Sequence, residues 1–165
     1  MMIRIYKPRE IDTKARLIKD RGVYADYSLI LRVIAHTGLQ YNELKYLMEN
    51  KRKFKEMYVS TPKRKIPLSI YGRNLLHELF SENTAIPSYT AVNRVFRYVG
   101  VNLKSLRLTW ITWLYSAYPR FRPVILRLYG ISVIPLFLER YERFVESLKE
   151  EDEKMIRSRT RGWRP

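Results

Sequence analysis

Apolar residues recur every three or four positions along most of this chain, and Gly or Pro interrupts each run. This spacing places the apolar side chains on one face of an α-helix. Leu29, Ile30, Val33 and Ile34 follow it and lead up to Gly38, a residue type that commonly ends helices. The same pattern predicts further helices over residues 8–20, 40–50, 75–80, 88–99, 103–117, 122–129 and 132–158. A chain with this pattern is expected to be mainly α-helical.

Residues 54–68 depart from the helical pattern. Apolar and polar residues alternate from Phe54 to Val59, and Pro62 then falls in the turn-like sequence TPKR. We therefore expect a small β-hairpin whose tip carries three cations, Lys63, Arg64 and Lys65. The predicted fold class is mainly α (α+β), with one helical domain over residues 1–158 and a basic hairpin inserted in it.

The end of the chain divides by charge. From Glu142 to Glu153 the sequence is rich in acidic residues, and a helix of this composition is expected to turn that face to solvent. The arginine-rich sequence RSRTRGWRP follows. We expect residues 159–165 to form a basic C-terminal tail, a flexible arm that touches nucleic acid or a neighbouring subunit.

The charge of the whole chain limits its partners. Lys and Arg number 32 against 16 Asp and Glu, which gives a formal net charge of +16, while 46% apolar residues allow a buried core. Such an excess repels itself in a compact state, so it indicates a polyanionic partner. DNA and RNA phosphates are the first candidates. An anionic membrane surface is the second, but the sequence lacks the run of about 18 apolar residues that a membrane-spanning helix needs.

The scarcity of metal ligands excludes several kinds of site. The chain has no cysteine, and its only histidines, His36 and His77, are far apart in sequence. Disulfides and zinc–thiolate sites are excluded, and carboxylates do not cluster as a two-metal nuclease requires. No metal and no cofactor is therefore expected. Abundant Tyr, Arg and Lys without Cys is also typical of a protein from a thermophile.

One charged residue falls where the core is expected. On a helical wheel of residues 103–117, Arg107 lies inside a broad apolar arc. Burying a guanidinium without an anionic partner is costly. Two partners are open: an internal carboxylate such as Glu43, or a bound phosphate, which the planar guanidinium can hold through two oxygens at once.

Five short motifs follow one another in a distinctive order. They are HTGLQYNEL, which begins at His36; STPKRKIPLS, which contains Lys63; the K-x-x-R pair Lys104 and Arg107; Leu128-Tyr129-Gly130-Ile131; and Tyr141, eleven residues after Gly130. In this order and spacing the chain resembles the catalytic domain of the tyrosine recombinases, the phage integrase family. The likeness is greatest to the divergent integrases of archaeal viruses and plasmids, and it covers residues 8–158.

The resemblance implies DNA strand breakage and rejoining. In the family a tyrosine attacks a DNA phosphodiester to form a 3′-phosphotyrosyl link, two arginines hold the non-bridging oxygens, and a lysine protonates the leaving 5′-oxygen. Carried over, Tyr141 is the nucleophile, Arg107 the second arginine, Lys104 the residue at the family's histidine position, and Lys63, or else Lys65, the hairpin lysine. Because fixed cations stabilise the charge on the phosphorane, this chemistry needs no metal.

Two family positions hold other residues. Gln40 stands at the first arginine position, where it can donate a hydrogen bond but brings no charge, and Ile131 replaces a histidine. Losing one preorganised donor typically costs about 10²–10³ in rate. The sequence therefore favours a recombinase-like protein that binds DNA with impaired or lost cleavage. An active minimal recombinase is the alternative, and an unrelated basic RNA-binding protein is the third hypothesis.

Several residues allow a purely structural interpretation. Tyr141 shares a helical stripe with Phe144, so it could be an ordinary core tyrosine, and the apolar arc places Trp110 and Trp113 in the core. The surface cations could contact phosphate or could simply be solvated. The predicted DNA contacts are Lys63, Arg64, Lys65, Arg94, Arg97, Lys104 and Arg107. The predicted partner is duplex DNA, with assembly of several copies on it left open. The resemblance also implies a cytoplasmic, nucleoid-associated protein of archaeal or viral origin.

Overall fold

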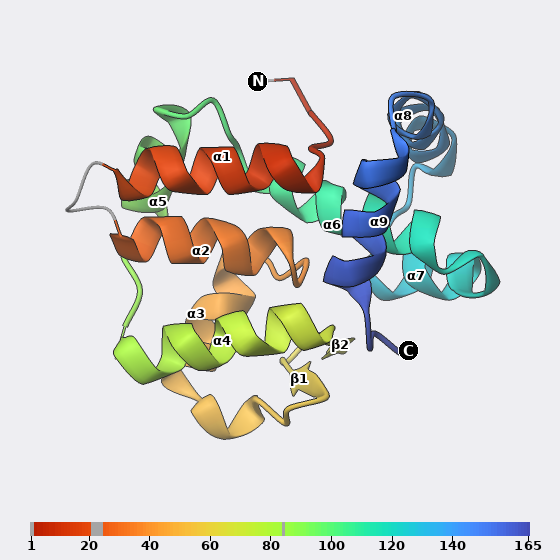
Figure 1. Cartoon of the computed structure of the whole chain (residues 1–165). Coiled ribbons are helices and arrows are strands. Elements are labelled where there is room, and N and C mark those ends of the chain that lie inside the picture. Colours follow the sequence, from red (N-terminus) through yellow and green to blue (C-terminus); the bar gives the residue numbers. More distant parts are fainter. Residues whose placement is uncertain (1, 21–24, 84) are drawn as a thin grey trace.

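In the computed structural model, which describes residues 2–20, 25–83 and 85–165, the chain is mainly helical with one small antiparallel sheet, as the sequence predicts (Figure 1). The elements in chain order are α1 (Pro8–Lys19), α2 (Ala25–Ala35), α3 (Tyr41–Glu49), the 3-10 turn η1 (Lys51–Lys53), β1 (Tyr58–Ser60), β2 (Lys65–Pro67), α4 (Ile70–Glu82), α5 (Tyr89–Arg97), α6 (Leu103–Ala117), the 3-10 turn η2 (Pro119–Phe121), α7 (Arg122–Leu128), α8 (Ile134–Glu146) and α9 (Glu150–Thr160).

Helices α2 and α6 form the centre of the fold. Helix α2 packs against α1, α4, α5 and α6, and Figure 1 shows α1, α2 and α4 as three neighbouring rows. On α6, Trp110 and Trp113 are fully buried, and their rings meet edge to face at 6.3 Å between centroids. The prediction that both tryptophans belong to the core is confirmed.

Local signals set the ends of α5. The Ser88 hydroxyl accepts a hydrogen bond from the Ala91 N–H at 3.2 Å, so Ser88 is the predicted N-cap. After the helix, Gly100 has φ +72°, and the Val101 N–H donates to the Phe96 carbonyl at 3.0 Å. Glycine adopts a positive φ without steric cost, and this geometry ends helices by satisfying their last carbonyls.

The basic hairpin is present but shorter than the alternating pattern suggests. Strand β1 pairs antiparallel with β2, and Tyr58 lies opposite Pro67. Thr61 and Arg64 exchange backbone hydrogen bonds across the turn, with Pro62 and Lys63 between them. Proline favours the first central position of such turns because its φ is already fixed.

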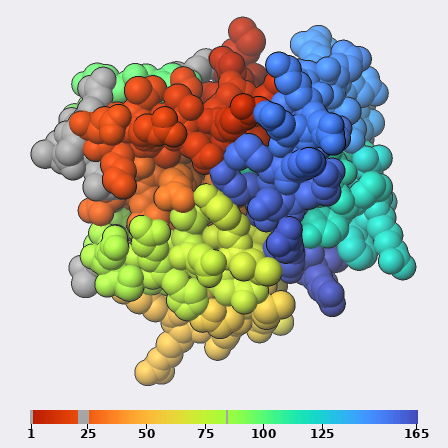
Figure 2. All heavy atoms as spheres, viewed as in Figure 1, coloured from red at the N-terminus to blue at the C-terminus, as the bar shows by residue number. Residues whose placement is uncertain are grey.

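The C-terminal segment, residues 159–165, is not a flexible arm. Arg159 and Thr160 belong to α9, and both are buried together with Trp163. Figure 2 shows α9 on the surface beside α1 and α4, and α9 also packs against α6. The prediction from charge alone was wrong, since it ignored the apolar ring of Trp163 and the carboxylate that meets Arg159.

The acidic residues from Glu142 to Glu153 are exposed, as predicted, except for Asp152, but they lie on two helices and not on one. The helix predicted over residues 132–158 breaks between Glu146 and Glu150, giving α8 and α9. Asp152 is 2% exposed at the start of α9, where its carboxylate accepts from the Lys149 N–H at 2.9 Å and lies 3.4 Å from the Lys7 ammonium. A carboxylate in the first turn satisfies a backbone donor and complements the helix dipole.

A buried polar network ties α9 to α1 and α2. The Arg159 guanidinium donates two hydrogen bonds to the Asp12 carboxylate, at 3.1 and 2.7 Å, and a third to Nε2 of His36 at 2.8 Å. The other ring nitrogen, Nδ1 of His36, lies 2.7 Å from the Arg32 carbonyl, to which it donates. Burial and the neighbouring Arg159 charge lower the pKa of His36 to about 3.

This network gives a specific dependence of stability on pH. Because the pKa of His36 falls from 6.5 to about 3 on folding, the unfolded chain binds the extra proton below pH 6.5. The free energy of unfolding should therefore decrease as pH falls from 6.5 to 4.5, by up to about 1.4 kcal/mol per pH unit. Urea unfolding over this range should show a flatter profile of stability against pH for His36→Gln than for the wild-type protein. Equal slopes in the two proteins would contradict the assignment.

Candidate anion-binding site

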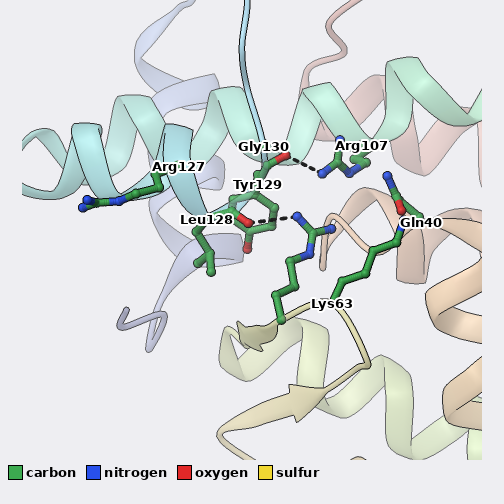
Figure 3. A pocket seen from close by; sticks show the side chains of 8 residues that line it. Gln40, Lys63, Arg107, Arg127, Leu128, Tyr129 and Gly130 are labelled. Atoms are coloured by element: carbon green, nitrogen blue, oxygen red, sulfur yellow. Dashed lines mark hydrogen bonds between the residues drawn. The ribbon is translucent and has the colours of Figure 1, made fainter.

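One hollow on the surface gathers cationic and amide side chains from separate parts of the chain. Its lining comes from the start of α3, the hairpin turn, α6 and the end of α7: Gln40, Lys63, Arg64, Arg107, Arg127, Leu128, Tyr129 and Gly130. Figure 3 shows Gln40, Lys63 and Arg107 converging, while Arg127 points away from them. Four predicted site residues, Gln40, Lys63, Arg64 and Arg107, therefore line one hollow.

Arg107 lies half-buried at the back of the hollow. Its Nε donates to the Gly38 carbonyl at 3.2 Å and its Nη2 to the Tyr129 carbonyl at 2.5 Å. Both acceptors are uncharged, so they orient the guanidinium without neutralising it. Burial, with the nearby Arg64 charge, lowers the pKa of Arg107 below its ordinary value. The site therefore holds a fixed, part-desolvated positive charge.

Arg64 turns inward from the hairpin tip, although the sequence places it among the exposed DNA contacts. Its side chain is only 15% exposed, and it donates to the Glu43 carboxylate at 2.7 and 3.1 Å and to the Leu128 carbonyl at 2.9 Å. The internal Arg–Glu pair considered for Arg107 is thus made by Arg64. The reason is geometric, because the turn brings Arg64 over the first turn of α3, where Glu43 lies.

Glu43 is the buried counter-charge of this region. Besides Arg64, it accepts hydrogen bonds from the Gln40 N–H at 3.0 Å and from the Thr61 hydroxyl at 3.1 Å. Burial opposes ionisation, but the bonds from Arg64, Gln40 and Thr61 outweigh it and lower the pKa of Glu43 below its ordinary value. Glu43 is therefore ionised at neutral pH, and one carboxylate faces two guanidinium groups.

Tyr129 supports the hollow from behind. It is fully buried, and its hydroxyl accepts from the indole N–H groups of Trp110 and Trp163, each at 3.3 Å. Burial raises the pKa of Tyr129 to about 12, so its hydroxyl stays neutral. Its carbonyl is thereby held against Arg107. The other carbonyl that accepts from Arg107 belongs to Gly38. The rings of Trp110 and Tyr129 approach Gly38 too closely for a side chain at this position.

Tyr141, the predicted nucleophile, is not among the residues that line this hollow. Its hydroxyl accepts from Nη2 of Arg122 at 2.9 Å, and its ring packs edge to face on Tyr115 at 4.7 Å. In Figure 1, α8, which carries Tyr141, lies at the top right of the view, and the hairpin lies below the centre. The structure therefore does not bring Tyr141 together with Gln40, Lys63 and Arg107 in this hollow.

The other predicted contacts are divided among different surfaces. Lys104 is exposed one turn before Arg107 and lines an adjoining hollow with Gln40 and Arg107. Arg97 lines the next hollow along. Arg94 is exposed elsewhere on α5, and the ammonium of Lys65 lies 5.2 Å from the centre of the Tyr58 ring.

Two residues near the hollow were not predicted from the sequence. Arg127, at the rim, is one of many cations, and nothing in its spacing distinguishes it. From the sequence, Tyr89 is simply one residue of the helix expected over residues 88–99, yet it lines the two adjoining hollows. Their positions depend on how α5 and α7 pack, which no local pattern reveals.

Comparisons with protein-family models, with curated proteins and with solved structures find no match to this chain. Over residues 2–20, 25–83 and 85–165, the structure contains no group of three or more His, Asp or Glu side chains that could hold a metal ion. Within the same residues, no helix has the length and apolar character needed to cross a bilayer.

Proposed function

We propose that this protein binds duplex DNA by holding a backbone phosphate in the hollow formed by Gln40, Lys63, Arg64 and Arg107, and that it is a degenerate relative of the tyrosine recombinases. One observation carries the proposal: two part-buried guanidinium groups, Arg64 and Arg107, lie near one carboxylate, Glu43. A site with this surplus of fixed positive charge is stabilised by an anion. A DNA-bound protein of this kind belongs on the nucleoid.

The chemistry of the hollow suits a phosphate. Arginine offers several N–H donors in a planar fork that matches phosphate oxygens, and such charge-assisted bonds are stronger where water is partly excluded. Lys63 is exposed at the rim and can reach a second oxygen, while Gln40 offers a neutral donor beside it. Contacts to phosphate position a protein on DNA without selecting a sequence.

Two features favour binding without cleavage. Gln40 adds no charge where the resemblance expects an arginine, and the Tyr141 hydroxyl is already paired with Arg122. Cleavage would need that hydroxyl to leave Arg122 and reach the phosphate beside Arg107. An active minimal recombinase that cuts through Tyr141 therefore remains the alternative, and it requires a rearrangement of α8 on DNA.

The binding proposal predicts a loss of affinity on removing these cations. Lys63→Gln should reduce the slope of log affinity against log salt concentration by about one unit, because one phosphate contact is lost. The free energy of unfolding should stay unchanged, because Lys63 is exposed. Arg107→Gln should weaken duplex binding by about tenfold or more. Fluorescence anisotropy with a labelled duplex at several salt concentrations measures both effects.

The control is Lys154→Gln, which removes an exposed cation paired with Glu150 on α9 and should leave duplex affinity close to wild type. Salt-independent binding, or equal losses in all three variants, would contradict the phosphate site. A nicked suicide duplex tests cleavage in the same samples. A covalent adduct that disappears in Tyr141→Phe would favour the active recombinase over the non-cutting protein.

A further inference from the structure

The phosphate hollow continues into a longer groove. The phosphate hollow and the hollow beside it are both lined by Gln40 and Arg107. This second hollow and a third one are both lined by Tyr89, Leu103 and Lys104. Because neighbouring hollows share walls, they form one track along the first turn of α6 towards α5. Arg107 lies where the first two hollows meet, and Arg97 lines the hollow at the far end of the track.

In the middle of the track an aromatic side chain, Tyr89, lies among the cationic ones. The ring of Tyr89, the first residue of α5, is 54% exposed and lines both adjoining hollows. The ring of Tyr41 supports it edge to face, with centroids 5.5 Å apart and planes 67° apart. The Tyr41 hydroxyl is itself fixed, because it donates to the Pro87 carbonyl at 2.6 Å. The track thus presents a supported aromatic ring between its cations.

Amide groups flank this ring. Asn42 contributes to the wall of the hollow nearest Arg107, and Asn93 to the wall of the hollow that contains Arg97. An amide side chain can both donate and accept hydrogen bonds, as the edge of a nucleic-acid base requires. No acidic residue is among the described residues that line the three hollows, so nothing in their walls repels a phosphodiester strand.

The spacing of the cations matches a strand that runs along the track. Lys104 and Arg107 are three residues apart on α6, about 4.5 Å along the helix axis. This is of the order of the rise of about 3.4 Å between successive phosphates on one DNA strand. A phosphate at Arg107 therefore leaves the next phosphate within reach of Lys104. The nucleotide between them then lies beside Tyr89.

We propose that Tyr89 is the stacking surface of a second subsite, which takes an unpaired DNA nucleotide next to the phosphate held by Arg107. A base can lie flat on an aromatic ring only after it has left its own base pair, so this subsite selects single-stranded tails, nicks or frayed ends next to a duplex. Arg107 and Lys104 hold the phosphates on either side of that base, and Arg97 is available to the phosphate that follows. This inference rests on the proposed phosphate site, because Arg107 sets where the strand enters.

The experiment compares three kinds of DNA: a blunt duplex, the same duplex with a short single-stranded tail (one version tailed at the 5′ end and one at the 3′ end), and the free strand. The wild-type protein should bind one of the tailed duplexes about tenfold more tightly than the blunt duplex, since stacking on one aromatic ring contributes on this scale. Tyr89→Ala should remove that preference and leave blunt-duplex affinity unchanged. Tyr89→Phe should retain it, because the ring remains.

A matched control is available on the same helix segment. Tyr98, which caps the C-terminal end of α5, is 62% exposed and does not line the three hollows, so Tyr98→Ala should keep the preference for the tailed duplex. Equal wild-type affinities for tailed and blunt duplexes, or an unchanged preference in Tyr89→Ala, would overturn the inference. So would an equal loss of affinity by Tyr89→Ala for all three DNAs, which would make Tyr89 an ordinary backbone contact.

Failure of this inference can be distinguished from failure of the proposed function. If the blunt duplex binds in a salt-dependent manner that Lys63→Gln weakens, the phosphate site stands whatever Tyr89 does. If blunt-duplex binding is indifferent to salt and to Lys63→Gln, the phosphate site itself is wrong, and the subsite fails with it.

Discussion

Replacing Trp163 with alanine is expected to lower the free energy of unfolding by about 3–5 kcal/mol. The indole is 1% exposed, packs on the rings of Tyr118 and Phe121 at centroid distances of 5.4 and 6.4 Å, and donates its N–H to the Tyr129 hydroxyl. The alanine variant leaves a cavity and removes one of the two donors to that hydroxyl. A loss of this size is a large share of the stability of a typical domain, which is about 5–15 kcal/mol.

Denaturant unfolding measures this loss as a lower midpoint at an unchanged slope. The control is Arg164→Ala, which truncates the exposed neighbouring residue and should change stability by no more than about 0.5 kcal/mol. Trp163→Phe should fall between wild type and alanine, because it keeps most of the ring and loses the N–H. A Trp163→Ala protein as stable as Arg164→Ala would mean that the C-terminal segment is a loose arm after all.

The second large effect is expected at Glu43. Glu43→Gln should lower the free energy of unfolding by about 3–5 kcal/mol, the usual cost of removing one partner from a buried ion pair. The side chain of Glu43 is 4% exposed, and its removal leaves the half-buried Arg64 and Arg107 without a carboxylate. The unfolding midpoint in denaturant at pH 7 measures the effect.

Inorganic phosphate provides the decisive comparison for this variant. An anion in the hollow would replace the missing carboxylate charge, so phosphate should stabilise Glu43→Gln more than wild type through preferential binding to the folded state. Glu49→Gln, an exposed substitution on the same helix, controls for general salt effects and should respond as wild type does. If phosphate stabilises all three proteins equally, the guanidinium pair is not an anion site.

Much of the fold could be predicted because its signals are local. The helix over residues 103–117 has the predicted bounds, since its apolar spacing and the Asn102 cap both lie within a few residues of the ends. The hairpin could be predicted from the alternation of apolar and polar residues before the turn and from Pro62 within it. The break between α8 and α9 was missed, because the acidic residues there read as one continuous polar helix and only packing shows that Asp152 starts a new one.

The candidate site was predictable as a set of residues but not as a geometry. Gln40, Lys63 and Arg107 were chosen from motif order, and they do line one hollow. The partner of each charge was not predictable. Glu43 pairs with Arg64, and the Tyr141 hydroxyl pairs with Arg122, in each case across about 20 residues of intervening chain.

The sequence by itself determined the helical character, the inserted basic hairpin, the positive surplus and the presence of a charged residue on the apolar face of α6. Each of these depends on residue type and on spacing within one or two helical turns. Tertiary structure alone decided that Arg64 faces inward, that Trp163 anchors the end of the chain, and that Tyr89 and Arg107 share a groove. Such pairings bring together elements far apart in sequence, and their energies depend on burial and distance, which no local pattern specifies.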